Sequence, residues 1–143
     1  MVSKVFKVIW IISLLAVVSV LFYTYAALGE QVSLGSGLPV ISRSGFFYGA
    51  LAVLTVFNAM SFPVMSMLKT ALQQAWFYGL LICLHLFMSS VFIFAGILNS
   101  NEKYDYSRLG PAVYGSFALF CIWIVLYPIV LIYQRRLGGG EVS

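Results

Sequence analysis

Charged residues are scarce in this sequence. Of 143 residues, Lys and Arg number 8 and Asp and Glu number 4, which is 8% of the chain, while 62% are hydrophobic. A water-soluble domain normally has about a quarter of its residues charged. A disordered or nucleic-acid-binding chain needs far more polarity or a basic patch. These classes are therefore excluded, and the composition indicates a membrane protein.

Cysteine and histidine are also nearly absent. Cys83 and Cys121 lie in apolar runs and form no CxxC pair, which excludes a thiol oxidoreductase. His85 is the single histidine, so this chain alone makes no bis-histidine haem site, although one axial ligand from His85 stays open. The ligands for metal hydrolysis and a GxSxG serine are missing too. We therefore expect no enzyme activity, no catalytic residue, no metal and no cofactor.

Long gaps between charged residues divide the chain into four parts. Residues 8–29, 44–68, 70–101 and 109–134 carry no formal charge. Each contains an apolar run that crosses about 30 Å of hydrocarbon as a helix. The runs lack the alternation of a membrane barrel. The sequence predicts an all-α integral membrane protein, one domain over 1–143, with four transmembrane helices at about 8–28, 45–67, 76–98 and 111–133 in an antiparallel bundle.

The basic residues predict the orientation of these spans. With both termini cytoplasmic, the inner side holds five Lys or Arg (4, 7, 69, 135 and 136) and the outer side three (43, 103 and 108). Outer loops are then 29–44 and 99–110, the inner loop is 68–75, and 134–143 is expected to be a flexible tail. Trp10 and Trp76 are expected at the inner boundary. Short loops favour a bacterial cytoplasmic (inner) membrane.

Two local features leave alternatives open. Lys4 and Lys7 before an apolar run also fit a cleaved secretory signal, but 8–28 is longer than a usual signal core, so we expect a retained span. In the first outer loop, residues 31–34 and 38–42 flank a Gly-Ser-Gly turn and are compatible with a small hairpin. Because Pro39 has no N–H to donate, we expect an irregular loop instead.

Two strongly polar side chains fall inside the predicted spans. Asn58 lies nine residues from the inner end of the second span (67 minus 58), and His85 nine from that of the third (85 minus 76). Nine residues at 1.5 Å is about 13–14 Å, near the membrane midplane. Since a short loop makes these spans antiparallel neighbours, we predict an Asn58–His85 hydrogen bond. No carboxylate lies in a span, so a neutral His85 is expected.

Hydroxyl residues flank this pair. Thr55 and Ser61 lie three residues either side of Asn58, and Ser89 lies one turn after His85. Such opposed stripes fit polar contacts that hold helices together, which is the interpretation we favour. They also fit the lining of a narrow path, or a His85 that faces a ligand or a partner subunit.

Small residues and prolines mark further positions in the spans. Glycines allow helix backbones to approach closely, and the candidates are Gly45, Gly49, Gly79 and Gly115. Pro63 and Pro128 each remove a helical hydrogen bond, so we expect kinks near the inner ends of the second and fourth spans.

Two functional hypotheses follow. The first is association: an accessory or scaffold subunit of a larger membrane complex, or a homo-oligomer, whose partners are membrane lipids, other membrane proteins or itself, and not nucleic acid. The second is a small channel or transporter, or a quinone- or haem-contacting subunit, that uses Asn58 and His85 as a polar lining.

Overall fold

The chain folds into long helices. A computed structural model describes residues 2–35, 37–100 and 109–138. The elements are α1 (Val2–Ala27), β1 (Gln31–Val32), β2 (Ile41–Ser42), α2 (Arg43–Ala59), α3 (Ser61–Met67), α4 (Ala71–Leu98) and α5 (Gly110–Gly138). Four stretches are long and apolar enough to cross a membrane: Val2–Ala27, Arg43–Met67, Ala71–Leu98 and Gly110–Tyr133. The predicted all-α class and the predicted number of helices long and apolar enough to span a membrane are confirmed.

Three helices, α1, α4 and α5, extend beyond the predicted spans at the end that the sequence predicts to be cytoplasmic. α1 includes Lys4 and Lys7, and α4 begins at residue 71 instead of 76. Thr70 caps α4: its Oγ1 accepts from Gln73 N at 3.2 Å, and its backbone N–H donates to Gln73 Oε1 at 3.4 Å. The inner connection is therefore only residues 68–70. α5 continues through Gly138, into the expected tail, whose residues 139–143 lie outside the described part of the chain.

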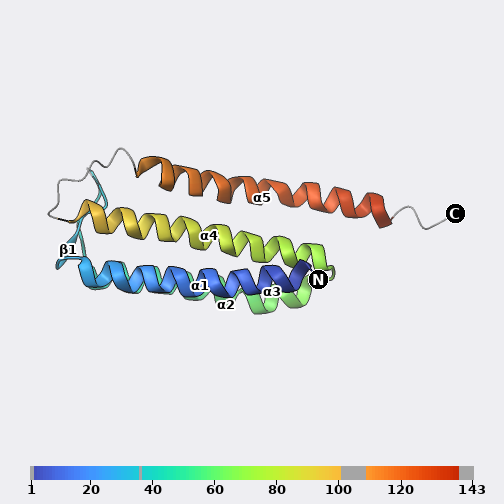
Figure 1. The fold of residues 1–143 in the computed structure, drawn as a ribbon, viewed down its shortest axis with the longest axis horizontal. Helices are drawn as coiled ribbons and strands as arrows, with labels where there is room; N and C mark the ends of the chain where they lie inside the picture. Colours follow the sequence, from blue (N-terminus) through green and yellow to red (C-terminus); the bar gives the residue numbers. More distant parts are fainter. Residues whose placement is uncertain (1, 36, 101–108, 139–143) are drawn as a thin grey trace.

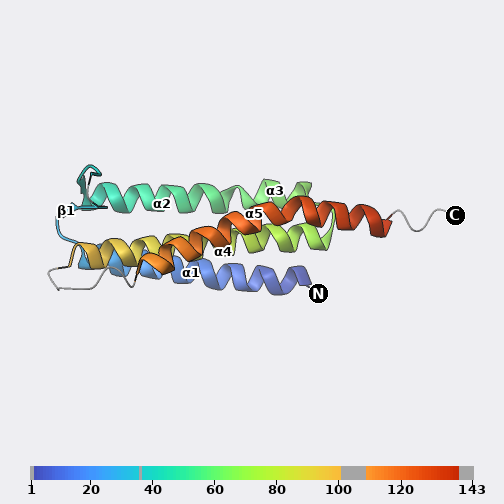
Figure 2. The same ribbon diagram turned by 90° about the horizontal axis from the view of Figure 1, so that it is seen from above.

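The helices lie side by side and alternate in direction along the chain (Figure 1). α4 lies over the space between α1 and α2, and α5 lies on the far side of α4 (Figure 1 and Figure 2). The first and third candidate spans, α1 and α4, run in the same direction (Figure 1) and have the most extensive contact. α2 reaches α4 through long side chains, such as the Phe46 and Phe92 rings, whose centroids are 5.8 Å apart.

Buried residues recur at a near-constant seven-residue interval where α1 meets α4, a contact that we call the α1–α4 seam. On α1 the buried residues Trp10, Val17 and Thr24 are seven apart, and on α4 the buried His85 and Phe92 are seven apart. Such a repeat keeps one face of each helix turned to the other along a gently coiled pair. Two apolar clusters fill the interior, one around Val17 and the other around Trp10.

The second span is broken in two. Pro63 has no N–H for the carbonyl of Ala59, and α2 ends at Ala59 with a turn at Met60 before α3 begins. The interruption lies at Met60, three residues before Pro63 and next to Ala59, whose carbonyl Pro63 cannot hydrogen-bond. Pro128 lies inside α5, which continues as one helix on both sides of it.

The loop predicted to be the first outer loop contains a hairpin, so the expected irregular loop is wrong. β1 and β2 pair antiparallel, with Gln31 opposite Ser42 and Val32 opposite Ile41. Pro39 lies before the paired residues, where its missing N–H costs no ladder bond. Asn99 at the end of α4 holds the hairpin, since its Oδ1 accepts from Ser33 N and its Nδ2 donates to Ser33 O, both at 2.8 Å.

Candidate functional site

His85 lies at the centre of a polar cluster between three helices. It is buried, with 1% of its surface exposed. Asn58 Nδ2 on α2 donates to His85 Nε2 on α4 at 3.1 Å. The hydrogen bond predicted between these two residues is therefore present in the structure.

Two residues of α1 complete the cluster. Trp10 Nε1 donates to Asn58 Oδ1 at 2.9 Å, and Ser13 Oγ lies 2.8 Å from His85 Nδ1. An indole N–H only donates, so Trp10 fixes which end of the Asn58 amide is oxygen. The amide nitrogen must then face His85, and it also donates to Leu54 O at 2.8 Å.

This orientation determines the proton position on the imidazole. Because Nε2 accepts from Asn58, the ring proton lies on Nδ1 and is donated to Ser13 Oγ. The Ser13 hydroxyl in turn donates to Trp10 O at 2.8 Å. The four residues therefore form a closed ring of hydrogen bonds, which we call the polar ring. It fits a neutral His85, since a second ring proton would face the Asn58 N–H donors.

The other predicted polar residues lie apart from this ring. Thr55 is exposed, Ser61 is buried and Ser89 is half-buried. Within residues 2–35, 37–100 and 109–138, none of these three hydroxyls is hydrogen-bonded to Asn58 or His85. Their role as packing or lining residues stays a prediction.

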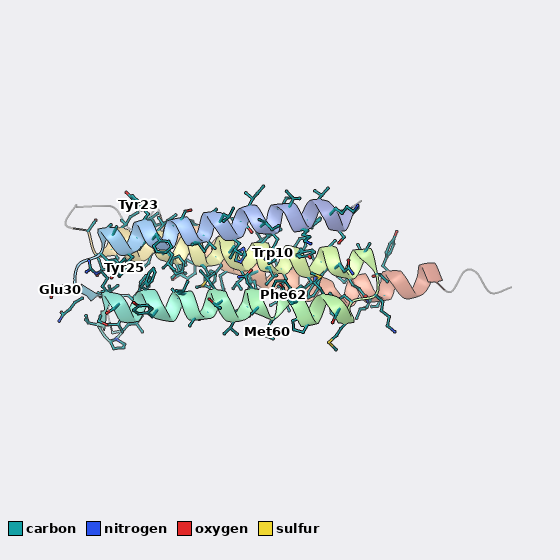
Figure 3. All side chains as sticks on the ribbon, turned by 90° about the horizontal axis from the view of Figure 1, so that it is seen from below. Trp10, Tyr23, Tyr25, Glu30, Met60 and Phe62 are labelled. Carbon is teal, nitrogen blue, oxygen red and sulfur yellow. The ribbon has the colours of Figure 1, made fainter. Side chains whose placement is uncertain are left out.

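A groove runs beside the polar ring between α1 and α2, and we call it the α1–α2 groove. Its volume is about 340 Å³. Trp10 on α1 and Phe62 at the start of α3 lie beside it (Figure 3). Its walls are apolar except for Thr55 and Asn58; the remaining lining residues are Leu14, Val18, Leu51, Leu54 and Ala59.

A second specific contact joins α4 to α5, and we call it the tryptophan clamp. Trp76 Nε1 donates to Trp123 O at 2.9 Å, and Trp123 Nε1 donates to Trp76 O at 2.8 Å. A Cβ added at Gly79 would lie 2.3 Å from Trp123 Cζ2, so only glycine leaves room for this ring. The Tyr127 ring packs on Trp76 with centroids 4.3 Å apart.

At the remaining predicted close-packing glycines, an added Cβ would meet no atom of another helix within 4 Å in the described part of the chain. A Cβ at Gly45 would meet only Ser42 Oγ at 3.0 Å, and at Gly49 or Gly115 it would meet nothing within 4 Å. Their packing role stays a prediction.

The sequence analysis placed Trp10 at the predicted inner boundary. It did not identify Trp10 as a partner of Asn58, or Ser13 as a partner of His85. Their depth was the usable signal. α1 begins at Val2, so Trp10 and Ser13 lie eight and eleven residues from its start (10 minus 2 and 13 minus 2), close to the nine counted for Asn58 and His85.

No group of three or more His, Cys, Asp or Glu side chains is arranged to hold a metal ion within the described ranges. Most of the polar second outer loop, residues 101–108, lies outside those ranges. No family model matches this sequence, and no curated protein or solved structure is significantly similar to it.

Proposed function

We propose that this protein spans a membrane four times with both ends on the cytoplasmic side, and that it functions by association, as an accessory or scaffold subunit or as a homo-oligomer. The first residues of α1 and the last residues of α5 lie on the same side of the molecule (Figure 1), as expected when both ends of the chain are on one side of the membrane. The hydropathy of the four helices supports insertion, and the basic bias of the predicted inner segments supports cytoplasmic ends. The short loops are the basis for proposing a bacterial cytoplasmic membrane.

The closed polar ring is the observation that carries this proposal. Polar side chains inside a membrane serve either to hold helices together or to contact a solute. Trp10, Ser13, Asn58 and His85 donate to one another in a cycle, and His85 is 1% exposed. These groups are thus already occupied within the chain. The ring also draws on α1 for two members, which supports a retained first span over a cleaved signal.

A second candidate function rests on the α1–α2 groove. Thr55 and Asn58 line an otherwise apolar groove of about 340 Å³. A small transporter, or a subunit contacting a hydrophobic cofactor, would use these two side chains as its polar contacts.

To test the first proposal, the protein is extracted in mild detergent from its own membrane. The native mass, the protein composition and the absorbance spectrum of the sample are then measured. We expect a homo-oligomer, or a fixed ratio to other membrane proteins, without a haem band. A monomer without partners would contradict association, and a haem band would favour the second candidate.

Substitution of His85 separates the two candidates further. His85→Leu breaks the polar ring, so association predicts reduced recovery of the assembly while transport into vesicles is unchanged. The lining function predicts an intact assembly with altered transport. Leu86→Ala is the matched control, because Leu86 adjoins His85 and is 48% exposed.

A further inference from the structure

The α1–α2 groove is formed without α4 or α5. Its lining residues come only from α1, α2 and the start of α3. In Figure 3 these helices lie in front, with α4 and α5 behind them, and Trp10 and Phe62 mark the two walls. Because the amide of Asn58 is engaged in the polar ring, the groove offers a ligand an apolar surface that is interrupted by the Thr55 hydroxyl. Its chemistry suits an apolar chain.

Aromatic rings close the groove at its predicted outer end. Val18 and Leu51 are the last lining residues in this direction. Four residues further along each helix (22 minus 18 and 51 minus 47) are Phe22 on α1 and Phe47 on α2, whose ring centroids are 5.4 Å apart. The Tyr25 ring centroid lies 4.7 Å from that of the same Phe47 ring. Because these rings join the two helices there, a chain in the groove enters from the other, predicted cytoplasmic end.

The α1 wall of the groove leads to a positive charge at that end. Trp10, Leu14 and Val18 line the groove, and Lys7 is exposed three residues before Trp10. At 100° per residue, Lys7 lies within about 20° of Leu14 around the helix, so it continues the same stripe. Its long side chain can follow the helix surface until the ammonium group reaches the membrane surface. A negatively charged group at the mouth of the groove is therefore within reach of Lys7.

A second lysine is placed at the same end by hydrogen bonds between α1 and the inner connection. Ser3 Oγ donates to Gln74 Oε1, and Gln74 Nε2 donates to Leu68 O, both at 3.2 Å. These bonds keep the connection beside the first turn of α1, and Lys69, which follows Leu68, is exposed there. Each wall of the groove therefore leads to an exposed lysine, Lys7 on α1 and Lys69 after α3. Basic pockets between helices on the cytoplasmic side are typical sites for anionic lipid headgroups.

We propose that the α1–α2 groove binds one anionic phospholipid of the cytoplasmic leaflet, with an acyl chain along the groove and the phosphate beside Lys7 and Lys69. Lys7 and Val18 are eleven residues apart (18 minus 7), which is about 16–17 Å along the helix. Half of the hydrocarbon thickness is about 15 Å, so a chain anchored at Lys7 reaches the closed end of the groove. This inference rests on the proposed membrane insertion and orientation, and it names a lipid as the occupant of the groove that the second candidate function uses.

Fluorescence of Trp10, which lines the groove, reports on the occupant. The full-length protein with Trp76→Phe and Trp123→Phe is placed in vesicles of phosphatidylethanolamine and phosphatidylglycerol, and one of the two lipids carries brominated chains, which quench tryptophan. Since one lysine near the membrane surface contributes about a fivefold preference for anionic lipid, the two lysines predict about a tenfold or greater preference for phosphatidylglycerol beside Trp10. Equal quenching by the two lipids at equal mole fraction would overturn the proposal.

Two matched pairs of substitutions test the headgroup and the chain separately. Lys7→Gln is expected to lower the preference about fivefold. Lys4→Gln is its control, because Lys4 lies about 80° from Leu14 around α1 and lines a different surface. Thr55→Phe fills the groove and is expected to reduce the quenching of Trp10 several-fold, whereas Val56→Phe, at an exposed residue outside the groove, leaves it unchanged. Equal effects within either pair would count against the groove as the lipid site.

Native mass spectrometry of the unsubstituted protein, released from the same vesicles, gives an independent measurement, and retained phosphatidylglycerol in preference to phosphatidylethanolamine is expected. The outcomes separate this inference from the proposed function. Quenching of Trp10 by neither lipid would overturn the lipid occupant, while the oligomeric state in detergent tests association separately. Quenching by both lipids alike would overturn the anionic preference and still agree with membrane insertion. A protein recovered outside the vesicles would overturn the proposed insertion as well.

Discussion

α4 contacts α1 and α5 in two different ways. Along the α1–α4 seam, polar contacts recur at the two ends and in the middle. In each of them, the α4 residue number exceeds the α1 residue number by nearly the same amount. Toward α5, the specific contacts are concentrated around the tryptophan clamp and Gly79. The seam contacts are Ser3 to Gln74 Oε1 at 3.2 Å, Ser13 to His85 at 2.8 Å and Thr24 to Phe92 O at 3.4 Å.

The difference bears on how membrane helices choose their neighbours. Lipid is as apolar as a leucine side chain, so helix position there depends on close packing and directional contacts more than on hydrophobic burial. Contacts spread from Ser3 to Thr24 determine the register of α1 against α4 along its length. α5 depends on the clamp, and the residues of its most apolar stretch are not buried within the described part of the chain.

The largest effect is expected where the α4–α5 contact has no spare room. In Gly79→Leu, the new Cβ would lie 2.3 Å from Trp123, whose ring is held by a hydrogen bond to Trp76 O and so does not easily move aside. Overpacking of this kind costs about 1–3 kcal/mol, and we expect the upper part of that range. Unfolding of the protein by sodium dodecyl sulfate in mild detergent micelles measures the change.

Gly49→Leu is the matched control for that experiment. Gly49 is also a helical glycine, but an added Cβ meets nothing within 4 Å, and leucine has the higher helix propensity. Its free energy of unfolding is expected to be unchanged or slightly increased. Equal destabilisation by the two substitutions would mean that the clamp geometry does not determine the cost.

The sequence predicted the four helices and one specific hydrogen bond, for identifiable reasons. Gaps between charged residues measure span length directly, and a short link between two spans allows depth to be counted from a shared end, which brought Asn58 and His85 together. No short link joins α1 to α4, so the depths of their residues could not be counted from a shared end in this way. Lys4 and Lys7 also concealed the start of α1, because long basic side chains allow a helix to continue while their charges reach the membrane surface.

The hairpin was compatible with the sequence but was not the interpretation we favoured, and the tryptophan clamp was not predicted, both because they depend on distant residues. Pairing of β1 with β2 is supported by Asn99, a residue that is 66 positions from Ser33. Gly79 was identified as a small residue, but its specific partner, Trp123, lies on a helix that is apolar all round and gives no sign of which face is turned to α4. Long-range contacts of this kind depend on the whole fold.

Removing one indole N–H from the polar ring and one from the tryptophan clamp gives a sharper comparison of these two contacts. Trp10→Phe leaves Asn58 Oδ1 without its donor and frees the amide to turn, which disturbs the polar ring. Trp123→Phe removes a donor from Trp76 O, a carbonyl that stays within the α4 helix. We expect a loss of about 1–2 kcal/mol for Trp10→Phe and about 0.5–1 kcal/mol for Trp123→Phe.

The same unfolding measurement applies to both variants. Since each exchanges tryptophan for phenylalanine, the loss of ring size is matched and the difference reports mainly on the orphaned amide oxygen. A greater loss for Trp123→Phe would indicate that α4 depends on the clamp more than on the polar ring.

The smallest effect is expected at the outer end of the α1–α4 seam. Thr24 Oγ1 donates to Phe92 O over 3.4 Å, a long hydrogen bond to a carbonyl that already lies within the α4 helix, and the Thr24 methyl group would be 3.5 Å from a Cβ at Gly96. Thr24→Val keeps the shape and the methyl contact while it removes the hydroxyl. Because no buried group loses its only partner, we expect a change in unfolding free energy below about 0.5 kcal/mol. A loss as large as that of Trp10→Phe would show that the seam depends equally on its polar contacts at every level, and the polar ring would then have no special place in it.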